Sequence, residues 1–416
     1  MSPKSGAKDS NELVRDLTGK RCPMAEHLRT GEANAVLLGA ATQAIIVFTD
    51  YPNRSRDKSP REMFPEVDAE DIERLRAGQA VLIVDHSREG PRHDVPFSGL
   101  LHEWADLHRI DRRSVVHSTT NHAFPASFAA WRAEDGIESS HQWLYFNTFV
   151  TDVAKFGRMA LSADETMDKL RSDRHEKRFL CLNNVARPHR LLIAAHLLDK
   201  RHSDALVSMG STKGDLQSIT KFENQVVGLY GSDEFQRDYG EVFLQATHAN
   251  VLDNCTITPS SDAVNQDRGR PIWAQLDLPL YYRTAVSVVT ETEMTQGHID
   301  RLTEKSLKPF MLGHVALVAG NPGVLKRVRE MGFETFDPVI DESYDEIVDP
   351  AHRLHALLGE IDRLRNMERQ DFSRMLEVTC EIRRENLRFG HESFEPATNS
   401  NLAKQMTKIL SNAQAR

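Results

Sequence analysis

Short apolar runs alternate with amphipathic stretches along the first part of the chain. Runs of roughly four to eight apolar residues between polar turns are typical of buried strands. Such runs predict strands at 42–49, 80–85 and 113–118, and the segment 100–107 has helical spacing. Strands that alternate with helices indicate an α/β domain with a largely parallel sheet. Residues 1 to about 40 are polar and weakly patterned, and we expect them to be partly disordered.

A second series of the same kind follows the charged stretch 169–178, which suits a domain boundary. Its predicted strands are 179–182, 286–290 and 315–319, and its predicted helices are 190–200 and 324–331. The pattern leaves residues 205–285 unassigned. The chain is therefore predicted to hold two α/β domains in tandem, at 1–170 and 171–385.

Capping residues predict the end of one helix and the start of another, and the apolar spacing after them predicts a helical tail. Gly332 follows the helix 324–331 as the residue that ends it. Asp349 and Pro350 predict the cap and first residue of a further helix. The apolar face of that helix is Leu354, Leu357, Leu358, Ile361 and Leu364. Residues 366–416 are predicted to be mostly helical and to pack back across both domains, with 386–416 as a separate tail.

Composition and charge exclude several classes of protein. Of the 416 residues, 40% are apolar and 27% are charged, with a net charge of −9. This negative charge argues against a protein that coats nucleic acid, but it allows a local basic pocket for a phosphorylated small molecule. No apolar run approaches the ~20 residues that span a bilayer, and the N-terminal segment lacks the apolar core of a signal peptide.

The cysteines and histidines form no metal-binding pattern. No pair of the four cysteines has zinc-ligand spacing, and the 18 histidines include no H-E-x-x-H motif, so we propose no metal site. Unpaired, widely separated cysteines fit a reducing compartment, and we expect a cytoplasmic protein.

The segment 179–190 carries basic residues just after a predicted strand. Ligands of open α/β sheets bind beyond the carboxyl ends of strands, where helix N-termini point their N–H groups. Arg187, His189 and Arg190 lie at such a place, next to Pro188 at the expected helix start. Guanidinium donors there suit phosphate oxygens. The alternative is a set of solvated charges on a helix start.

Thr303, Glu304 and Lys305 form a second candidate. Thr303 suits an N-cap, which places the other two in the first helical turn. A glutamate favours the positive end of the helix dipole and a lysine does not, so Lys305 is a candidate for an external anion. Pro309 is expected to break or kink this helix within about a turn. The alternative is an exposed charge pair of little energetic value.

Asp85 and Glu89 follow the predicted strand 80–85 and are candidates for a general base. The alternative is a hydrophilic loop. Residues 320–323 contain two glycines that suit a turn. No Walker loop is present, and no G-x-G-x-x-G motif follows a predicted strand.

The ordered segments FLCLNNVARPHR, VSVVTET, TEKSLKPF, LVAGNPGVLKRVREMGFETF and DESYDEI resemble glycosyltransferases of the two-domain GT-B type. The shared elements are F-L-C-L-N with R-x-H-R, and T-E-K with a following proline. The T-E-K element is also similar to the S-E-K motif of α-1,3-fucosyltransferases and to a related element of exostosin-like transferases. The resemblance covers about residues 178–192 and 286–365. The residues after Lys305 depart from the fucosyltransferase pattern, so it implies no particular donor sugar.

This resemblance implies two Rossmann-like domains that face a central cleft, with the donor nucleotide on the C-terminal one. It places Glu304 at the ribose and Lys305 at the diphosphate, and assigns Arg187 or Arg190, with Asn183, to the same site. The implied activity is metal-independent transfer from a GDP- or UDP-linked sugar to a glycan, lipid-linked or protein hydroxyl. Asp85 or Glu89 would be the base if the reaction inverts the anomeric centre.

Two other functions stay open on the sequence. One is an inactive GT-B-like module that binds a glycan or a protein. The other is a phosphosugar epimerase or hydrolase with two similar domains, which would bind monophosphates. We expect no nucleic-acid binding and no transmembrane segment.

Overall fold

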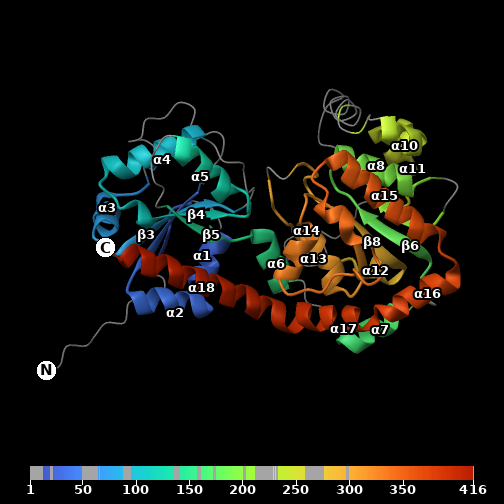
Figure 1. Cartoon of the computed structure of the whole chain (residues 1–416). Helices are drawn as coiled ribbons and strands as arrows, with labels where there is room; N and C mark the ends of the chain where they lie inside the picture. Colours follow the sequence, from blue (N-terminus) through green and yellow to red (C-terminus); the bar gives the residue numbers. More distant parts are fainter. Residues whose placement is uncertain are drawn as a thin grey trace. The chain divides into compact units, whose positions relative to one another are not determined.

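The structure of the chain is a computed structural model in which two compact units are distinguished (Figure 1). It describes residues 13–18, 22–48, 64, 66–87, 95–134, 141–156, 161–171, 175–199, 203–210, 228, 230, 233–257, 276–296 and 299–415. The first unit comprises Met1–Thr151, His298–Arg301 and Glu395–Arg416, and the second comprises Asp152–Gly297 and Leu302–Phe394. The C-terminal segment therefore belongs to the same unit as the N-terminal strands.

The first unit is built on a five-stranded parallel sheet whose strands lie in sequence order. They are β1 (Val14–Asp16), β2 (Gln43–Phe48), β3 (Ala80–His86), β4 (Val115–Thr119) and β5 (Gln142–Tyr145). The helices of this part are α1 (Pro23–Leu28), α2 (Gly31–Ala40), α3 (Ala69–Arg76), α4 (Val95–Leu107), α5 (Phe124–Glu134) and α18 (Phe394–Gln414). The three strands predicted here are confirmed as β2, β3 and β4, and the predicted helix as part of α4. The expected disorder before residue 40 is wrong for the described residues there, because β1, α1 and α2 bury apolar side chains.

Alternate residues of each strand bury against opposite layers of helices. Ile45, Leu82 and Val84 pack with α3 and α4. Helices α3 and α4, which connect β2 to β3 and β3 to β4, thus cover one face of the sheet. Ala44 and Ile83 lie on the other face, which α1, α2 and α18 cover. The C-terminal helix thus completes a three-layer α/β/α unit (Figure 1).

Helix α18 also covers the outer edge of β5. The side-chain amide of Gln405 accepts a hydrogen bond from the Tyr145 backbone N–H at 2.8 Å and donates one to its carbonyl at 3.3 Å. The Gln142 side chain donates to the Ile409 carbonyl at 2.9 Å. An edge strand left open exposes unpaired backbone groups that can pair with another chain. Here a side chain of α18 satisfies them.

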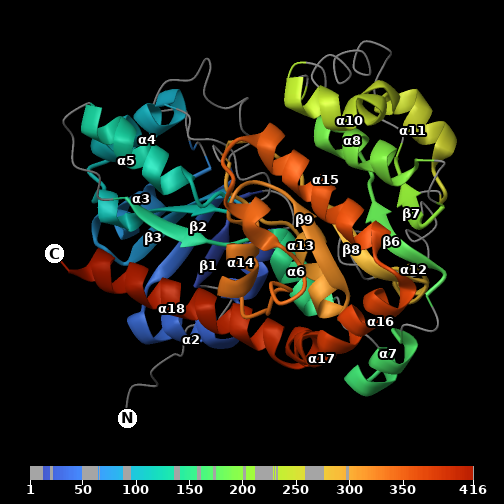
Figure 2. The same ribbon diagram turned by 45° about the vertical axis from the view of Figure 1, so that its right-hand side comes forward.

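The second unit is built on a four-stranded parallel sheet in the order β7-β6-β8-β9. The strands are β6 (Lys177–Leu182), β7 (Ala205–Ser208), β8 (Thr284–Thr290) and β9 (Val315–Ala319). Its helices are α7 (Ala163–Lys169), α8 (Pro188–Leu197), α10 (Asp233–Gln245), α11 (His248–Asn254), α12 (Leu278–Tyr282), α13 (Glu304–Met311), α14 (Val324–Glu330), α15 (Pro350–Asn366), α16 (Arg369–Val378) and α17 (Cys380–Arg388). Helix α6 (Thr148–Phe156) contains the division between the units. Figure 2 shows α8, α10 and α11 gathered beside β6 and β7.

The local predictions for this unit hold at several particular residues. The predicted strands correspond to β6, β8 and β9, and the predicted helices to α8 and α14. Gly332 has φ +101°, as expected of a residue that ends a helix in the left-handed region. Asp349 caps α15 by accepting from the backbone N–H groups of Ala351 and His352. The five apolar residues of the α15 face are fully buried. Strand β7 lies in the stretch that the sequence pattern left unassigned, and β5 was not predicted either.

The predicted α/β class is confirmed, with a parallel sheet in each of two Rossmann-like units and a helical C-terminal tail. Within the described ranges, every helix is too short or too polar to cross a bilayer.

Candidate functional site

The order of strands in the second unit identifies one place in its sheet as a ligand site. The chain enters at β6, passes to β7 on one side, and then continues to β8 on the other side of β6. Connections that diverge from neighbouring strands leave a crevice at the carboxyl ends of those strands, and open α/β sheets bind ligands there. This switch point lies between β6 and β8. Helix α8 follows β6, and α13 follows β8.

Arg187 stands at the N-terminus of α8 at this point. It occupies the N-cap in an extended conformation, and Pro188 begins the helix. Proline suits the first helical position because its missing N–H has no helical partner there. The Arg187 side chain is half-buried, and its Nε atom is buried with no hydrogen-bond partner among the described residues. A buried donor without a partner costs free energy, which a bound anion would recover.

Arg190 is one turn further along and is used by the protein itself. Its guanidinium donates to the backbone carbonyls of Glu291 at 2.9 Å, Val185 at 2.9 Å and Thr290 at 3.3 Å. His189 Nε2 lies 3.0 Å from the same Glu291 carbonyl. Burial, together with the charge of Arg187, lowers the pKa of Arg190 to about 10, and burial lowers the pKa of His189 to about 3. Both side chains hold α8 to the end of β8.

Glu291 follows β8 and holds the N-terminus of α13. Its Oε1 accepts from the Thr303 backbone N–H at 3.0 Å and from the Ser306 hydroxyl at 2.5 Å. Its Oε2 accepts from the Thr303 hydroxyl at 2.7 Å. Burial alone would raise the pKa of this carboxyl, but the charge of Lys305 and the hydrogen bonds of Ser306 and Thr303 outweigh it and hold the pKa below its ordinary value. Glu291 is therefore a buried, ionised carboxylate.

Lys305 and Glu304 form the first turn of α13, and Thr303 is its N-cap, as predicted. Lys305 Nζ lies 3.1 Å from the Thr303 hydroxyl and 3.5 Å from Glu304 Oε1, with 31% of its side chain exposed. Glu304 is buried, and its Oε2 has no hydrogen-bond partner among the residues that the structure describes. The turn thus presents a partly exposed cation beside an unsatisfied acceptor. Pro309 lies inside α13, and the helix ends two residues later at Met311.

Asn183 ties three strands together at the same edge. Its Oδ1 accepts from the Thr290 hydroxyl at 2.5 Å, and its Nδ2 lies 3.2 Å from Cys181 Sγ. Its backbone N–H donates toward Ser208 Oγ at 3.1 Å, and its carbonyl accepts from Gly210 N at 3.0 Å. These contacts use the side chain inside the protein, at the floor of the switch point.

Of the two candidate bases in the first unit, only Asp85 is described, and Glu89 lies outside the described residues. Asp85 is the next-to-last residue of β3 and has 3% of its surface exposed. Its Oδ1 accepts from the Ser87 backbone N–H at 2.9 Å, and Cys22 Sγ lies 3.9 Å from Oδ2. The hydrogen bond from Ser87 fixes the turn after β3, so Asp85 has a structural role there.

The structure thus brings together Arg187, Asn183, Glu304 and Lys305 at the carboxyl ends of β6 and β8, and assigns Arg190 to holding the same region. It adds Glu291, which sequence reasoning did not single out. The available signal was a glutamate directly after the buried strand 284–290, in a segment that the resemblance already contained. Within the described parts of the chain, no group of three or more histidine, cysteine, aspartate or glutamate side chains could hold a metal ion.

Comparison with protein-family models and with curated proteins found no match. Among solved structures, the chain is similar to a UDP-forming α,α-trehalose-phosphate synthase from Burkholderia xenovorans, with 12% identity, a TM-score of 0.41, and coverage of 91% of this chain and 80% of that chain. It is also similar to an E. coli structure described as trehalose-6-phosphate bound with UDP-2-fluoro glucose, with 12% identity, a TM-score of 0.41, and coverage of 93% and 79%. A third is the N-terminal domain of Candida albicans trehalose-6-phosphate phosphatase, with 10% identity, a TM-score of 0.42, and coverage of 94% and 75%.

Proposed function

We propose that this chain is a GT-B-type glycosyltransferase that transfers a sugar from a UDP- or GDP-linked donor to a hydroxyl acceptor. The observation that carries the proposal is the switch point of the second sheet, where Arg187 at the start of α8 and Lys305 with Glu304 at the start of α13 follow two adjacent strands, and where Arg187 Nε and Glu304 Oε2 are buried without partners among the described residues. A nucleoside diphosphate offers two phosphates to Arg187 and Lys305, and its ribose hydroxyls can donate hydrogen bonds to the Glu304 carboxylate. The T-E-K and R-x-H-R elements of the sequence support the same assignment.

In this proposal the positive side chains of the second unit stabilise the negative charge of the leaving nucleoside diphosphate. As the glycosidic bond to the diphosphate breaks, negative charge grows on the leaving phosphate oxygen. Lys305 and Arg187 are in place before the reaction, so their stabilisation of this charge requires little rearrangement. Asp85 and Glu89 stay proposals for the base of an inverting reaction. A retaining reaction would not need that base.

The proposal includes transfer without a bound metal ion, because the two side-chain cations supply the neutralisation that a diphosphate needs. We therefore expect EDTA to leave the turnover of a donor sugar unchanged. A loss of turnover in EDTA that Mg²⁺ or Mn²⁺ restores would contradict this part of the proposal.

The direct test is a thermal-shift screen with UDP, GDP, CDP and their sugars, followed by variants of Lys305. A ligand at 100 times its dissociation constant should stabilise the protein by about 2.7 kcal/mol. Lys305→Ala should weaken binding of the diphosphate by roughly ten- to a hundredfold and leave nucleoside binding unchanged, because the lysine would contact phosphate. Lys326→Ala, on exposed α14, is the matched control.

Slow release of nucleoside diphosphate from the selected donor would distinguish an enzyme from an inactive binding module. If Lys305→Ala binds and turns over every donor as the parent does, the assignment of the donor site is wrong.

A further inference from the structure

The three segments of the candidate site meet at one residue, Glu291. Its carboxylate accepts hydrogen bonds from Thr303 and Ser306 at the start of α13. Its backbone carbonyl accepts hydrogen bonds from Arg190 in α8. Glu291 is only 2% exposed, so it lies beneath this edge of the sheet and does not contact a ligand directly. It connects the R-x-H-R segment to the T-E-T and T-E-K segments, although the first lies about 100 residues before the other two.

The hydrogen bonds from α13 to Glu291 take the place of a capping box, with the carboxylate supplied from outside the helix. In a capping box, the third residue of the helix is a glutamate that reaches back to the N-cap backbone N–H. In α13 that third residue is Ser306, and the carboxylate comes from Glu291 at the end of β8. A negative charge is favoured at this end of a helix by the helix dipole. The first turn of α13 is thereby fixed to the sheet.

Lys305 is connected to the same carboxylate through one hydroxyl group. Lys305 Nζ donates to Thr303 Oγ1 at 3.1 Å, and Thr303 Oγ1 donates its own hydrogen to Glu291 Oε2 at 2.7 Å. A hydroxyl has one hydrogen and two acceptor lone pairs, so both bonds can exist together. The acceptor at Glu291 dictates the direction of the Thr303 hydroxyl. The free lone pairs of that hydroxyl then face Lys305.

We propose that Glu291 is the positioning residue of the donor site. It does not touch the donor: its ionised carboxylate orients Thr303 and Ser306, and through them sets where Lys305 and Glu304 present their charges. A neutral glutamine in its place would keep the size but bring an N–H₂ group, which would face donors from Thr303 and Ser306. At least one of the present hydrogen bonds would then be lost. This inference rests on the proposed function of the site, which it extends by one residue.

The experiment compares Glu291→Gln with Asp345→Asn as a matched control. Asp345 is also a buried carboxylate that caps a helix from outside, since its Oδ2 accepts from the Leu325 backbone N–H of α14 at 3.1 Å. Dissociation constants of UDP and GDP, and of uridine and guanosine, are measured for each variant that circular dichroism shows to be folded. We expect Glu291→Gln to weaken diphosphate binding about tenfold or more and nucleoside binding less than about twofold. Asp345→Asn should change neither by more than about twofold.

A double-mutant cycle separates positioning from a general loss of stability. If Glu291 acts through Lys305, Glu291→Gln should cost less than about twofold in diphosphate affinity when Lys305→Ala is already present. Equal losses in both backgrounds, or equal losses for nucleoside and diphosphate, would overturn the proposal. Ser306→Ala removes one hydroxyl donor to the carboxylate and should give part of the same effect, so it serves if Glu291→Gln does not fold.

Hydrogen exchange distinguishes failure of this inference from failure of the proposed function. Backbone amides of residues 303–308 should exchange faster in Glu291→Gln than in the parent, and not in Asp345→Asn. If the parent binds no nucleoside diphosphate but this difference is seen, the positioning of α13 stands and the proposed donor is wrong. If exchange at 303–308 is unchanged in Glu291→Gln, the positioning function itself is refuted.

Discussion

Arg187 and Arg190 lie three residues apart in one motif, yet their surroundings give them different tasks. Arg190 is 3% exposed and donates to three backbone carbonyls, whereas Arg187 keeps a buried Nε with no partner in the described residues. The same residue type is thus structural at one position and open to a ligand at the other. The helix geometry decides which, because Arg187 is the N-cap and Arg190 lies inside the first turn.

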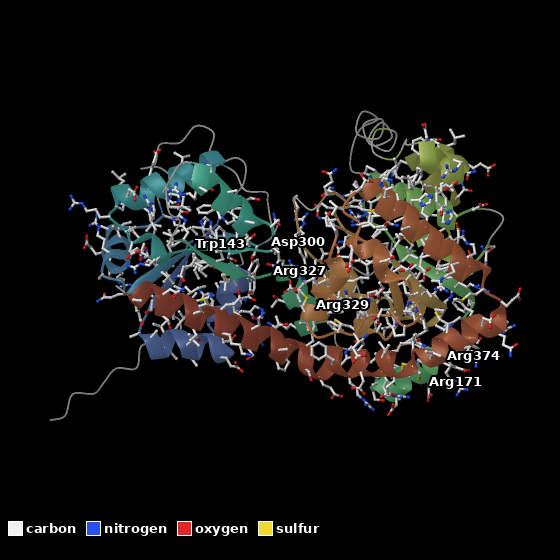
Figure 3. All side chains as sticks on the ribbon, in the orientation of Figure 1. Trp143, Arg171, Asp300, Arg327, Arg329 and Arg374 are labelled. Carbon is white, nitrogen blue, oxygen red and sulfur yellow. The ribbon has the colours of Figure 1, made fainter. Side chains whose placement is uncertain are left out.

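Substitution of the two arginines should separate stability from binding. Arg190→Ala removes the guanidinium donor to three backbone carbonyls, of which that of Glu291 keeps only His189, and should lower the free energy of unfolding by about 3 kcal/mol or more. Arg187→Ala should change it by less than about 0.5 kcal/mol and weaken UDP or GDP binding about tenfold. Urea unfolding and calorimetric titration measure the two effects. Arg374→Ala, on exposed α16 (Figure 3), is the control for loss of a surface arginine. Equal stability losses at both positions would contradict the division of tasks.

The sequence could predict which residue types gather at the site, but not which of them face a ligand. The positions of Lys305 and Glu304 follow from an N-cap threonine and from the edge of a parallel sheet, and both are local signals. Arg190 reaches the Glu291 carbonyl 101 residues away, and the Glu291 carboxylate reaches Thr303 and Ser306 on a different element, so no pattern within one element contains these partners. A buried ionised glutamate at a strand end also looks like any polar loop residue until its donors are known.

At the scale of secondary-structure elements, the first unit has an unusual layer between its sheet and the helices α4 and α5. Rings fill this layer where aliphatic side chains would be ordinary. His117 of β4 stacks on Trp143 of β5 with ring centres 4.8 Å apart, and its Nε2 lies 2.9 Å from His141 Nδ1. His102 of α4 stacks on His141 at 4.3 Å. His86 of β3 stacks on His117 at 5.6 Å. The layer is polar in composition but closed to water, since these histidines are nearly fully buried.

Burial in this layer lowers the pKa of three of its histidines, His86, His102 and His141, and keeps them neutral. It lowers the pKa of His86 to about 3, and burial with the charges of Arg132 and Arg112 lowers the pKa of His102 to about 4. Burial and the charge of His102 also lower the pKa of His141 well below its ordinary value. In the unfolded chain each histidine binds a proton below about pH 6.5. The buried histidines of the folded state do not, so lowering the pH favours the unfolded state. Stability is therefore full above about pH 6.5 and falls as the pH drops toward 4.

We expect the first unit to lose stability between pH 7 and pH 5, by up to about 1.4 kcal/mol per pH unit below 6.5 for each neutral histidine. Three of the four tryptophans, Trp104, Trp131 and Trp143, lie in this unit, so thermal unfolding followed by tryptophan fluorescence reports on it. His102→Phe keeps the ring and removes one titrating group, and should reduce the decrease. The exposed His352→Gln should not alter it. An unfolding temperature that stays constant over this range would exclude the histidine layer as a source of pH dependence.

At the scale of the whole molecule, the C-terminal helix belongs to the fold of the first unit. Leu402, Met406, Ile409 and Leu410 of α18 lie in one apolar cluster with residues of β2, β3 and β4. The sequence predicted a helical tail, and the structure confirms the helix. The place where it packs could not be read from its own spacing. It depends on which face of the sheet α3 and α4 leave to α1 and α2, and this requires knowledge of the strand order and of the helix packing.

Met406→Ala should therefore destabilise a unit whose sheet begins almost 400 residues earlier. Met406 is fully buried, and such a truncation costs about 2–5 kcal/mol. Lys408→Ala, two residues further along and exposed, should change the stability by less than about 0.5 kcal/mol. Tryptophan fluorescence should show the loss as an earlier unfolding of the first unit. Equal unfolding temperatures for the two variants would mean that α18 contributes little to it.

The packing of α18 has a consequence for the folding of the chain during translation. In many proteins of several domains, the N-terminal domain completes its fold while the rest is still being translated. Here the five strands emerge first, but the helix that completes the cover of one face and of the edge of β5 is made after the second unit. Until then α1 and α2 alone cover the face that contains Ala44, Ile46, Val81 and Ile83, and the part that α18 buries stays exposed to other chains. The nascent first unit is thus a candidate client for chaperones throughout the synthesis of the second.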